Sequence, residues 1–151
     1  MGRDLRAGRW PKRLSNESGQ ALVEAALVIP VLLLLAFGVV MAGRVSHSKI
    51  AVQAAAREAS RALATAPSEQ EGIVEALDAA RSVAEGYGLS PDGLTVTVQS
   101  NGFQRGGTAT AEVTYRVPLG DLPLLNRVEV TVSSSHSERI DLYRSREAVL
   151  R

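Results

Sequence analysis

The longest apolar stretch of the chain runs from Ala21 to Ala42, and Glu24 is the only charged residue within it. Each residue of a helix rises about 1.5 Å, so about 20 residues cross the roughly 30 Å hydrocarbon core of a bilayer. Pro30 is the only strong helix breaker in the stretch. The pattern predicts a transmembrane helix over residues 20–43.

The helical pattern continues beyond this stretch. Apolar positions recur with a seven-residue spacing at Val45, Val52, Ala59 and Ala66. Such a spacing places one apolar stripe along a helix, and alanine, which dominates the positions between, is the strongest helix former. The first helix is therefore predicted from about Gln20 to Thr65, with residues 44–66 as an extension outside the membrane. The stripe packs either on the chain's own domain alone or on both, with its outer half covered by the domain and its inner half by neighbouring subunits.

A second helix is predicted to begin at Ser68, because Pro67 ends the first helix and residues 68–71 form a capping box of the Ser-x-x-Glu type. Gly86 and Gly88 are expected to end it. Its apolar face is predicted to consist of Ile73, Val74, Leu77, Ala80, Ala84 and Tyr87. The Pro-Asp-Gly sequence that follows predicts a turn over residues 90–93.

From Leu94 the apolar spacing changes to two, the period of a β-strand. Strands are predicted over 94–99, 109–117 and 128–133, and the tail from Ser133 either extends the third strand or frays. These strands predict an antiparallel meander packed on the helices, so residues 67–151 are expected to form a small α+β domain. The apolar segment 118–125 is expected to fold back over the sheet, with an exposed patch for another subunit as the alternative.

Charge divides the chain unevenly. Residues 1–19 carry five basic and two acidic residues, whereas the whole chain has a net charge of +1. By the positive-inside rule, this basic leader predicts a cytoplasmic N-terminus and an outward-facing C-terminal domain. The remainder is mildly acidic and offers no electrostatic footprint for nucleic acid. The chain has no cysteine, which excludes disulfides and thiolate metal ligands.

Neither an enzyme nor a bound cofactor or metal is expected from the sequence. The two histidines, His47 and His136, have no cysteine and no paired carboxylates at helical spacing nearby. A Ser/His/Asp triad could be assembled from residues 133–135, His136 and Asp141, but such residues are ordinary in a polar tail. No glycine-rich phosphate loop lies between a strand and a helix.

The most informative motif is the junction between the basic leader and the apolar helix. A cut after Gly19 would make Gln20 the new N-terminus and would leave Glu24 at the fifth position of the mature helix. This pattern resembles prepilin-type proteins that are processed by a prepilin peptidase. Residues 18–44, with Val-Glu before Pro30, a leucine block and Gly-Arg at the end, are similar to the TadE-like minor pseudopilins of tight-adherence (Flp-type) pilus systems. Ala25 stands where that family usually has an aromatic residue.

The resemblance implies a pilin-like fold and the role of a pilus or secretion-machine subunit. Gly19 and Gln20 would form the processing site, and Glu24 would neutralise the amine of a subunit's N-terminus during assembly. Pro30 matches a proline of the family and is expected to bend or loosen the helix. Two further residues, Gly38 and Ala42, form a small-xxx-small pair that permits close helix contact.

The implied partners are a prepilin peptidase, other pilin or pseudopilin subunits, the pilus assembly platform and membrane lipid. The implied location is the cytoplasmic membrane, and the pilus after assembly. Two alternatives remain: an uncleaved single-pass accessory or scaffold protein, and a secreted soluble domain cut near Ala42. The position of cleavage separates all three. An N-terminal Gln20 can also cyclise with loss of ammonia, which would remove the amine that Glu24 is expected to meet.

Overall fold

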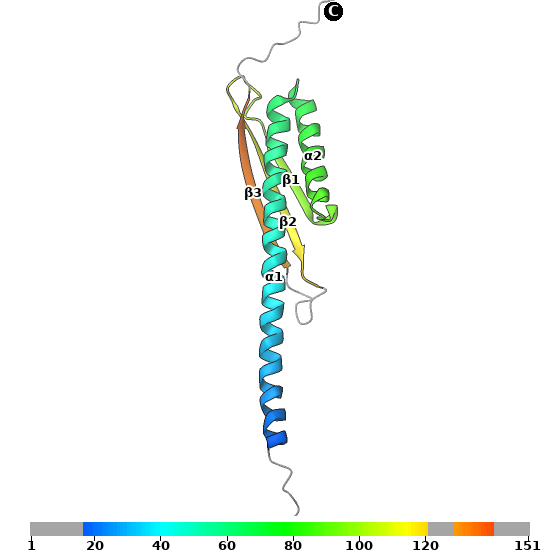
Figure 1. Ribbon diagram of the computed structural model, residues 1–151. Coiled ribbons are helices and arrows are strands. Elements are labelled where there is room, and N and C mark those ends of the chain that lie inside the picture. Colours follow the sequence, from blue (N-terminus) through cyan, green and yellow to red (C-terminus); the bar gives the residue numbers. More distant parts are fainter. Residues whose placement is uncertain (1–16, 121–128, 141–151) are drawn as a thin grey trace, which may run out of the picture. The chain divides into compact units, whose positions relative to one another are not determined.

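The computed structural model describes residues 17–120 and 129–140 (Figure 1). The chain divides into two units, residues 1–38 and 39–151, which are described in turn. The elements are the helices α1 (Glu17–Thr65) and α2 (Glu69–Gly86), a short 3-10 turn η1 (Pro91–Gly93), and the strands β1 (Leu94–Gln99), β2 (Thr108–Pro118) and β3 (Glu129–Arg139). This is the α+β arrangement that the sequence predicts, with a long apolar helix, a second helix and three strands.

The described part of the first unit is the N-terminal part of α1, and nearly all of its side chains are exposed. The helix begins at Glu17, slightly before the predicted start, and it passes through Pro30 without interruption. Its most apolar window has a mean hydropathy of 2.8, and none of that window is buried. By length and composition, α1 is therefore a candidate membrane span.

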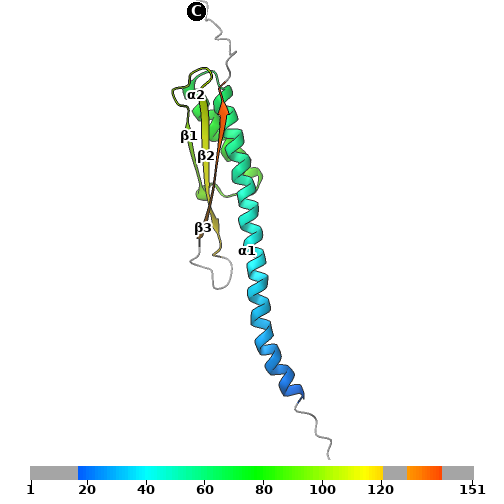
Figure 2. The same cartoon turned by 90° about the vertical axis from the view of Figure 1, so that its left-hand side faces the viewer.

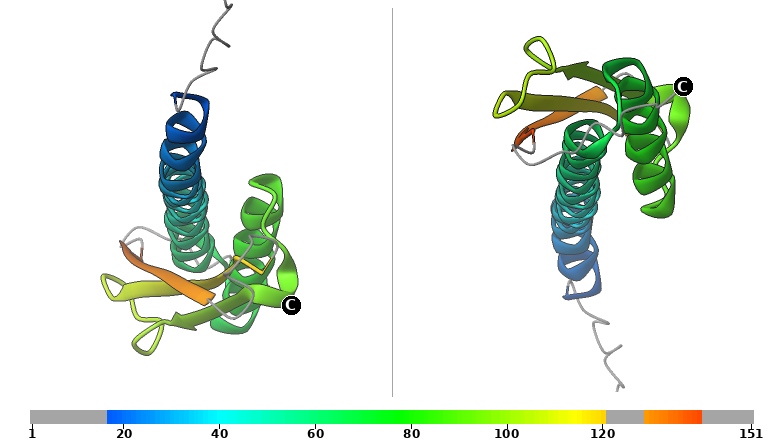
Figure 3. Two further views of the ribbon diagram at one scale, coloured as in Figure 1. Left: turned by 90° about the horizontal axis from the view of Figure 1, so that it is seen from below. Right: turned by 90° about the horizontal axis from the view of Figure 1, so that it is seen from above.

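In the second unit, α2 and the part of α1 from residue 39 lie over one face of the sheet (Figures 1 and 3). The alanine-rich stripe of α1 is buried in the core of this unit; its fully buried members are Ala51, Val52, Ala55, Ala56, Ala59 and Leu63. The stripe therefore packs on the chain's own domain, and contact of its inner half with neighbouring subunits stays a prediction.

The three strands form one antiparallel layer in the order β1-β2-β3, seen nearly edge-on in Figure 2. Val96 of β1 pairs with Val113 of β2, and Thr114 of β2 pairs with Ser133 of β3. Every second side chain of β2 is buried, and these residues are Ala109, Ala111, Val113, Tyr115 and Val117. The predicted meander and its two-residue period are confirmed.

The third strand extends through the serine-rich tail as far as Arg139, and Ile140 after it is buried. Pairing along the whole of β2 explains this length, because each tail residue from Ser133 to Arg139 has a partner in that strand. In the segment 118–125, Leu119 is fully buried, as expected for a segment that covers the sheet. The other three leucines of that segment lie outside the described residues.

Both ends of α2 are capped as the sequence predicts. The Ser68 hydroxyl accepts a hydrogen bond from the Glu71 N–H at 3.3 Å. After the helix, Gly88 has a φ of 77°, and the N–H groups of Gly88 and Leu89 donate to the carbonyls of Glu85 (2.8 Å) and Ala84 (3.0 Å). This is a Schellman motif, which favours glycine because of the positive φ.

The predicted apolar face of α2 is partly wrong. Val74 and Tyr87 are 59% and 40% exposed, whereas Ala80 and Ala84 are buried as predicted, together with Gly72 and Ala76, which the prediction does not include. The reason is the close approach of the two helices. A Cβ atom built on Gly72 would lie only 2.8 Å from the Cβ atom of Ala66 and 3.0 Å from Leu63. Small side chains thus define the packed face of α2.

Replacing Gly72 by alanine is expected to destabilise the domain by about 1–3 kcal/mol, because the added methyl group overpacks the contact with α1. A loss of stability is informative because helix propensity alone would favour alanine over glycine by about 1 kcal/mol and would stabilise the helix. Gly86→Ala is the matched control, because a Cβ atom there meets nothing within 4 Å. Thermal unfolding of both full-length variants in detergent, followed by circular dichroism, measures the difference. Equal stability of the two would contradict the close approach.

Candidate functional site

The predicted processing site lies in the first turns of α1. Gly19 and Gln20 are both helical and exposed. A Cβ atom built on Gly19 meets nothing within 4 Å, so no described part of the chain packs against this residue. The chain's own packing therefore does not explain why residue 19 is a glycine.

Glu24 lies one helical turn after Gln20 and is exposed. Residues four apart share one face of a helix, so this spacing can bring a carboxylate to an N-terminal amine on residue 20. Glu24 makes no hydrogen bond or ion pair with any part of the chain that the structure describes. In a membrane, a carboxylate costs about 2.5–3.5 kcal/mol at the helix centre and less near its end, so a partner from elsewhere would be favourable.

The residues predicted to pack helices lie further along α1. Pro30 lies within the helix, where its missing N–H removes one backbone hydrogen bond. Gly38 has no atom within 4 Å of a built Cβ, and Ala42 is exposed. The described part of the chain does not cover Gly38 or Ala42, so their role in packing against other helices stays a prediction.

The two histidines are placed separately in the domain. The Nε2 atom of His47 lies 2.9 Å from the carbonyl oxygen of Tyr87, and the two rings are 6.0 Å apart. This contact holds α1 to the C-terminal end of α2. On β3, His136 lies 3.7 Å from Glu138. Of the triad considered from the sequence, Asp141 lies outside the described residues.

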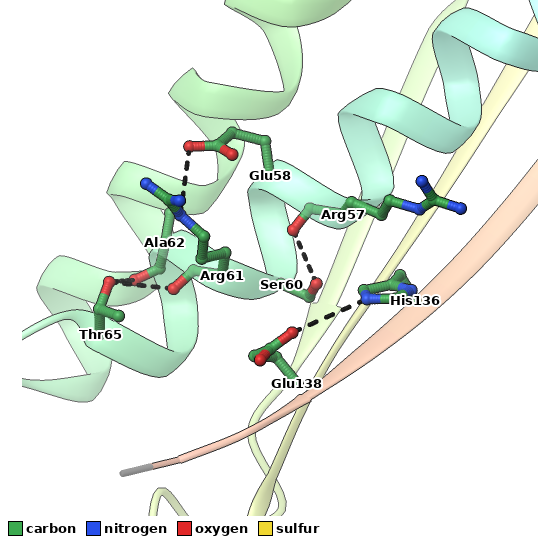
Figure 4. A network of polar contacts seen from close by, with 8 residues as sticks. All are labelled: Arg57, Glu58, Ser60, Arg61, Ala62, Thr65, His136 and Glu138. Carbon is green, nitrogen blue, oxygen red and sulfur yellow. Dashed lines mark hydrogen bonds and ion pairs between the residues drawn. The ribbon is translucent and has the colours of Figure 1, made fainter.

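Some polar contacts of the domain lie within one element, as Figure 4 shows, whereas others join elements: the Ser100 hydroxyl donates to the Glu69 carboxylate, and the Tyr115 hydroxyl accepts from the Ser90 N–H at 3.4 Å. The Ser60 hydroxyl donates to the carbonyl of Arg57 at 2.9 Å, and Arg61 pairs with Glu58 at 3.7 Å within the same helix. Over the part of the chain covered by the structure, no group of three or more histidine, aspartate or glutamate side chains is arranged to hold a metal ion.

Two exposed aliphatic residues of the domain were missed by the sequence prediction. Ile50 on α1 is 55% exposed, and Val74 on α2, which was assigned to the buried face, is 59% exposed. A signal was available for Val74, because three acidic residues flank it at helical spacing: Glu71, Glu75 and Asp78. A carboxylate-rich side of a helix is more often a solvated face than a packed one.

Comparison with protein families gives a match along α1. Residues 19–61 match the family model described as TadE-like protein. The matched region begins at Gly19 and continues along α1 into its alanine-rich extension, beyond the end of the similarity seen at residues 18–44. The family predicted from the sequence is therefore confirmed for this region. No curated protein and no solved structure matches the chain.

Proposed function

We propose that this chain is a minor pilin or pseudopilin of a tight-adherence pilus or of a related secretion machine. The proposal is supported by the match of residues 19–61 to the TadE-like family, because that family implies involvement in a tight-adherence pilus system. One observation carries the proposal: the first turns of α1 contain Gly19, Gln20 and Glu24, and the helix then exposes an unbroken run of apolar side chains. A helix of this kind needs lipid around it in a membrane and other helices around it in an assembly.

The first step of the proposed function is removal of the leader, residues 1–19, by a prepilin peptidase. The absence of a side chain on Gly19 lets the peptidase approach the backbone before the cut. The basic residues of the leader hold it on the cytoplasmic side, where this cut takes place. Cleavage creates a positively charged α-amine on Gln20 at the membrane surface.

The second step is assembly through α1. As the helix leaves the lipid for a bundle of helices, Glu24 pairs with the amine of Gln20 in its own subunit or in a neighbour. Either charge alone is costly in a low-dielectric environment, so the pair favours the assembled state. This step requires that Gln20 keeps an intact amine, methylated or not, instead of cyclising.

The role is structural and not catalytic. The polar contacts of the described domain either lie within one element, such as Ser60 with Arg57, or join two of its elements, such as Ser100 with Glu69. Met41 and Val45 pack against the core of the domain, so a cut near Ala42 would remove part of this packing. This contact disfavours the alternative of a secreted domain released at that position.

Deletion of this chain tests the proposal. Cells that lack it are expected to lose their surface pili or the secretion that depends on the same machine, and the wild-type chain is expected to restore them. Quantitative mass spectrometry should find the restored chain in the membrane fraction, and in sheared pili if it enters the filament. Normal piliation and secretion in the deletion strain would contradict the proposed role.

A further inference from the structure

The two helices of the domain carry opposite charge. The segment 44–65 of α1 has four basic residues and one acidic residue, Glu58. In contrast, α2 has five acidic residues and one basic residue, Arg81. The segment 44–65 of α1 is therefore mainly basic, and α2 is mainly acidic.

On each helix, exposed charged residues of one sign lie together on one side. The basic face of α1 consists of Ile50, Gln53, Arg57 and Arg61, and the acidic face of α2 consists of Glu71, Val74, Glu75 and Asp78; all eight are exposed. Their spacings of three and four residues place each set on one side of its helix. Each face thus combines exposed charges of one sign with a single aliphatic residue.

The aliphatic residues make these faces unlike ordinary solvated helix surfaces. Ile50 and Val74 are more than half exposed, and among the described residues from 44 onward such exposure of a large aliphatic side chain is confined to these two. An apolar residue bordered by charged ones is a common composition for the centre and rim of a protein interface. Both faces therefore suit a partner that supplies an aliphatic side chain surrounded by opposite charge.

Each face offers what the other requires, so we propose that the basic face of one copy of this chain binds the acidic face of a second copy. Where only one face of each copy takes part, the contact is heterologous, and each subunit can use its other face to bind a third copy. Such a contact forms an open row unless the rotation between copies closes it. The inference rests on the proposed function and adds a subunit contact outside the membrane-spanning part of α1.

The contacts that these charges make within the chain do not compete strongly. Arg61 pairs with Glu58 at 3.7 Å and Asp78 pairs with Arg81 at 3.8 Å, and the four side chains are between 44% and 73% exposed. Exposed pairs of this kind contribute little to stability, so they can be exchanged for contacts with another copy. Rim charges are also screened by salt, so the proposed contact weakens as ionic strength rises.

The position of the two helices guides the choice of probes. They run side by side from the contact of Gly72 with Leu63 to the contact of Tyr87 with His47. Gln70 and Ser82 are exposed at two heights along the acidic side of α2, and Gln53 is exposed within the basic face. Cysteines at these positions remove neither a charge nor an aliphatic residue, and the chain contains no other cysteine.

Cross-linking of full-length chains in native membranes tests the contact. A chain with Gln53→Cys is co-expressed with a differently tagged chain that carries Gln70→Cys or Ser82→Cys, and a short bis-maleimide is added. We expect a mixed dimer with at least one of the two partners. Gln53→Cys with Thr97→Cys, on the exposed outer face of β1, is the matched control. Yields no higher than this control for both pairs would overturn the proposal, as would cross-linking to a different protein instead.

Charge reversal supplies the second readout. Arg57→Glu with Arg61→Glu in the Gln53→Cys chain is expected to lower the yield of mixed dimer several-fold. Glu75→Lys with Asp78→Lys in the partner chain is expected to restore it, which a merely unfolded variant cannot do. Unchanged yield after the first reversal, or no recovery after the second, would overturn the proposal.

The outcome for this contact can be told apart from the outcome for the proposed function. If cross-linking fails while deletion of the chain still abolishes pili, the proposed function stands and the contact is wrong. If the mixed dimer forms but deletion leaves pili and secretion normal, the contact stands and the proposed function is wrong.

Discussion

A chain with valine in place of Gly19 is expected to retain its leader, and the uncut form should replace the mature form almost completely. The added side chain would stand at the residue before the cut, where the peptidase must approach the backbone. The chain itself tolerates the change, because a Cβ atom on Gly19 meets no described atom within 4 Å. Gel mobility and intact mass of the membrane-bound protein measure the ratio of the two forms.

Gly38→Val is the matched control for this experiment. It makes the same substitution in the same helix, and a Cβ atom there also meets nothing within 4 Å. Processing of this variant should equal that of the wild type. If Gly19→Val is cut as efficiently as Gly38→Val, residue 19 is not the processing site.

A chain with alanine in place of Glu24 should be cut normally and fail to support assembly. The substitution removes a carboxylate whose insertion into a membrane costs about 2.5–3.5 kcal/mol at a helix centre and less near the end, so insertion should improve. What is lost is the partner of the Gln20 amine, which would then be buried alone. Counting pili on cells, and measuring the mature chain in membranes, separates loss of assembly from loss of protein.

Two variants sharpen this result. Glu24→Gln keeps the size of the side chain and removes its charge, and it should fail as Glu24→Ala does. Glu112→Ala removes an exposed carboxylate from β2, away from α1, and should assemble as the wild type does. Normal pili from the Glu24→Gln variant would show that the charge of Glu24 is not required.

Hydrophobic periodicity was sufficient to predict most of the architecture. A continuous apolar run followed by an alanine stripe predicts one helix, and α1 ends at Thr65 as expected. Alternation from Leu94 predicts the sheet, because the strands have one face in the core and one in water. These elements follow from local spacing alone, so no knowledge of their partners was needed.

The packed face of α2 could not be predicted in the same way. Periodicity placed Ala80 and Ala84 correctly, but it also selected Val74 in place of Gly72 and Ala76, which pack where the backbone of α1 lies close. Glycine and alanine carry little hydrophobic signal of their own. The identity of the buried face therefore depended on the distance between two helices, which the sequence of one helix does not contain.

In the candidate site, too, local features could be predicted from the sequence and contacts between distant residues could not. The spacing of Gly19, Gln20 and Glu24 is local, so sequence was enough to propose their roles. The contact between His47 and Tyr87 joins residues forty positions apart, and no local sequence pattern predicts it. The partner proposed for Glu24 is created only by a cut, so neither the sequence nor the fold of the intact chain contains it.

The central claim is that this chain is processed between Gly19 and Gln20. Intact mass and N-terminal peptide mapping of the protein from native membranes test it most directly. A mature chain that begins at Gln20 with an intact or methylated amine is the predicted result. An uncut N-terminus, a chain that begins at Gly43, or a Gln20 that is wholly cyclised would contradict the role given to Glu24.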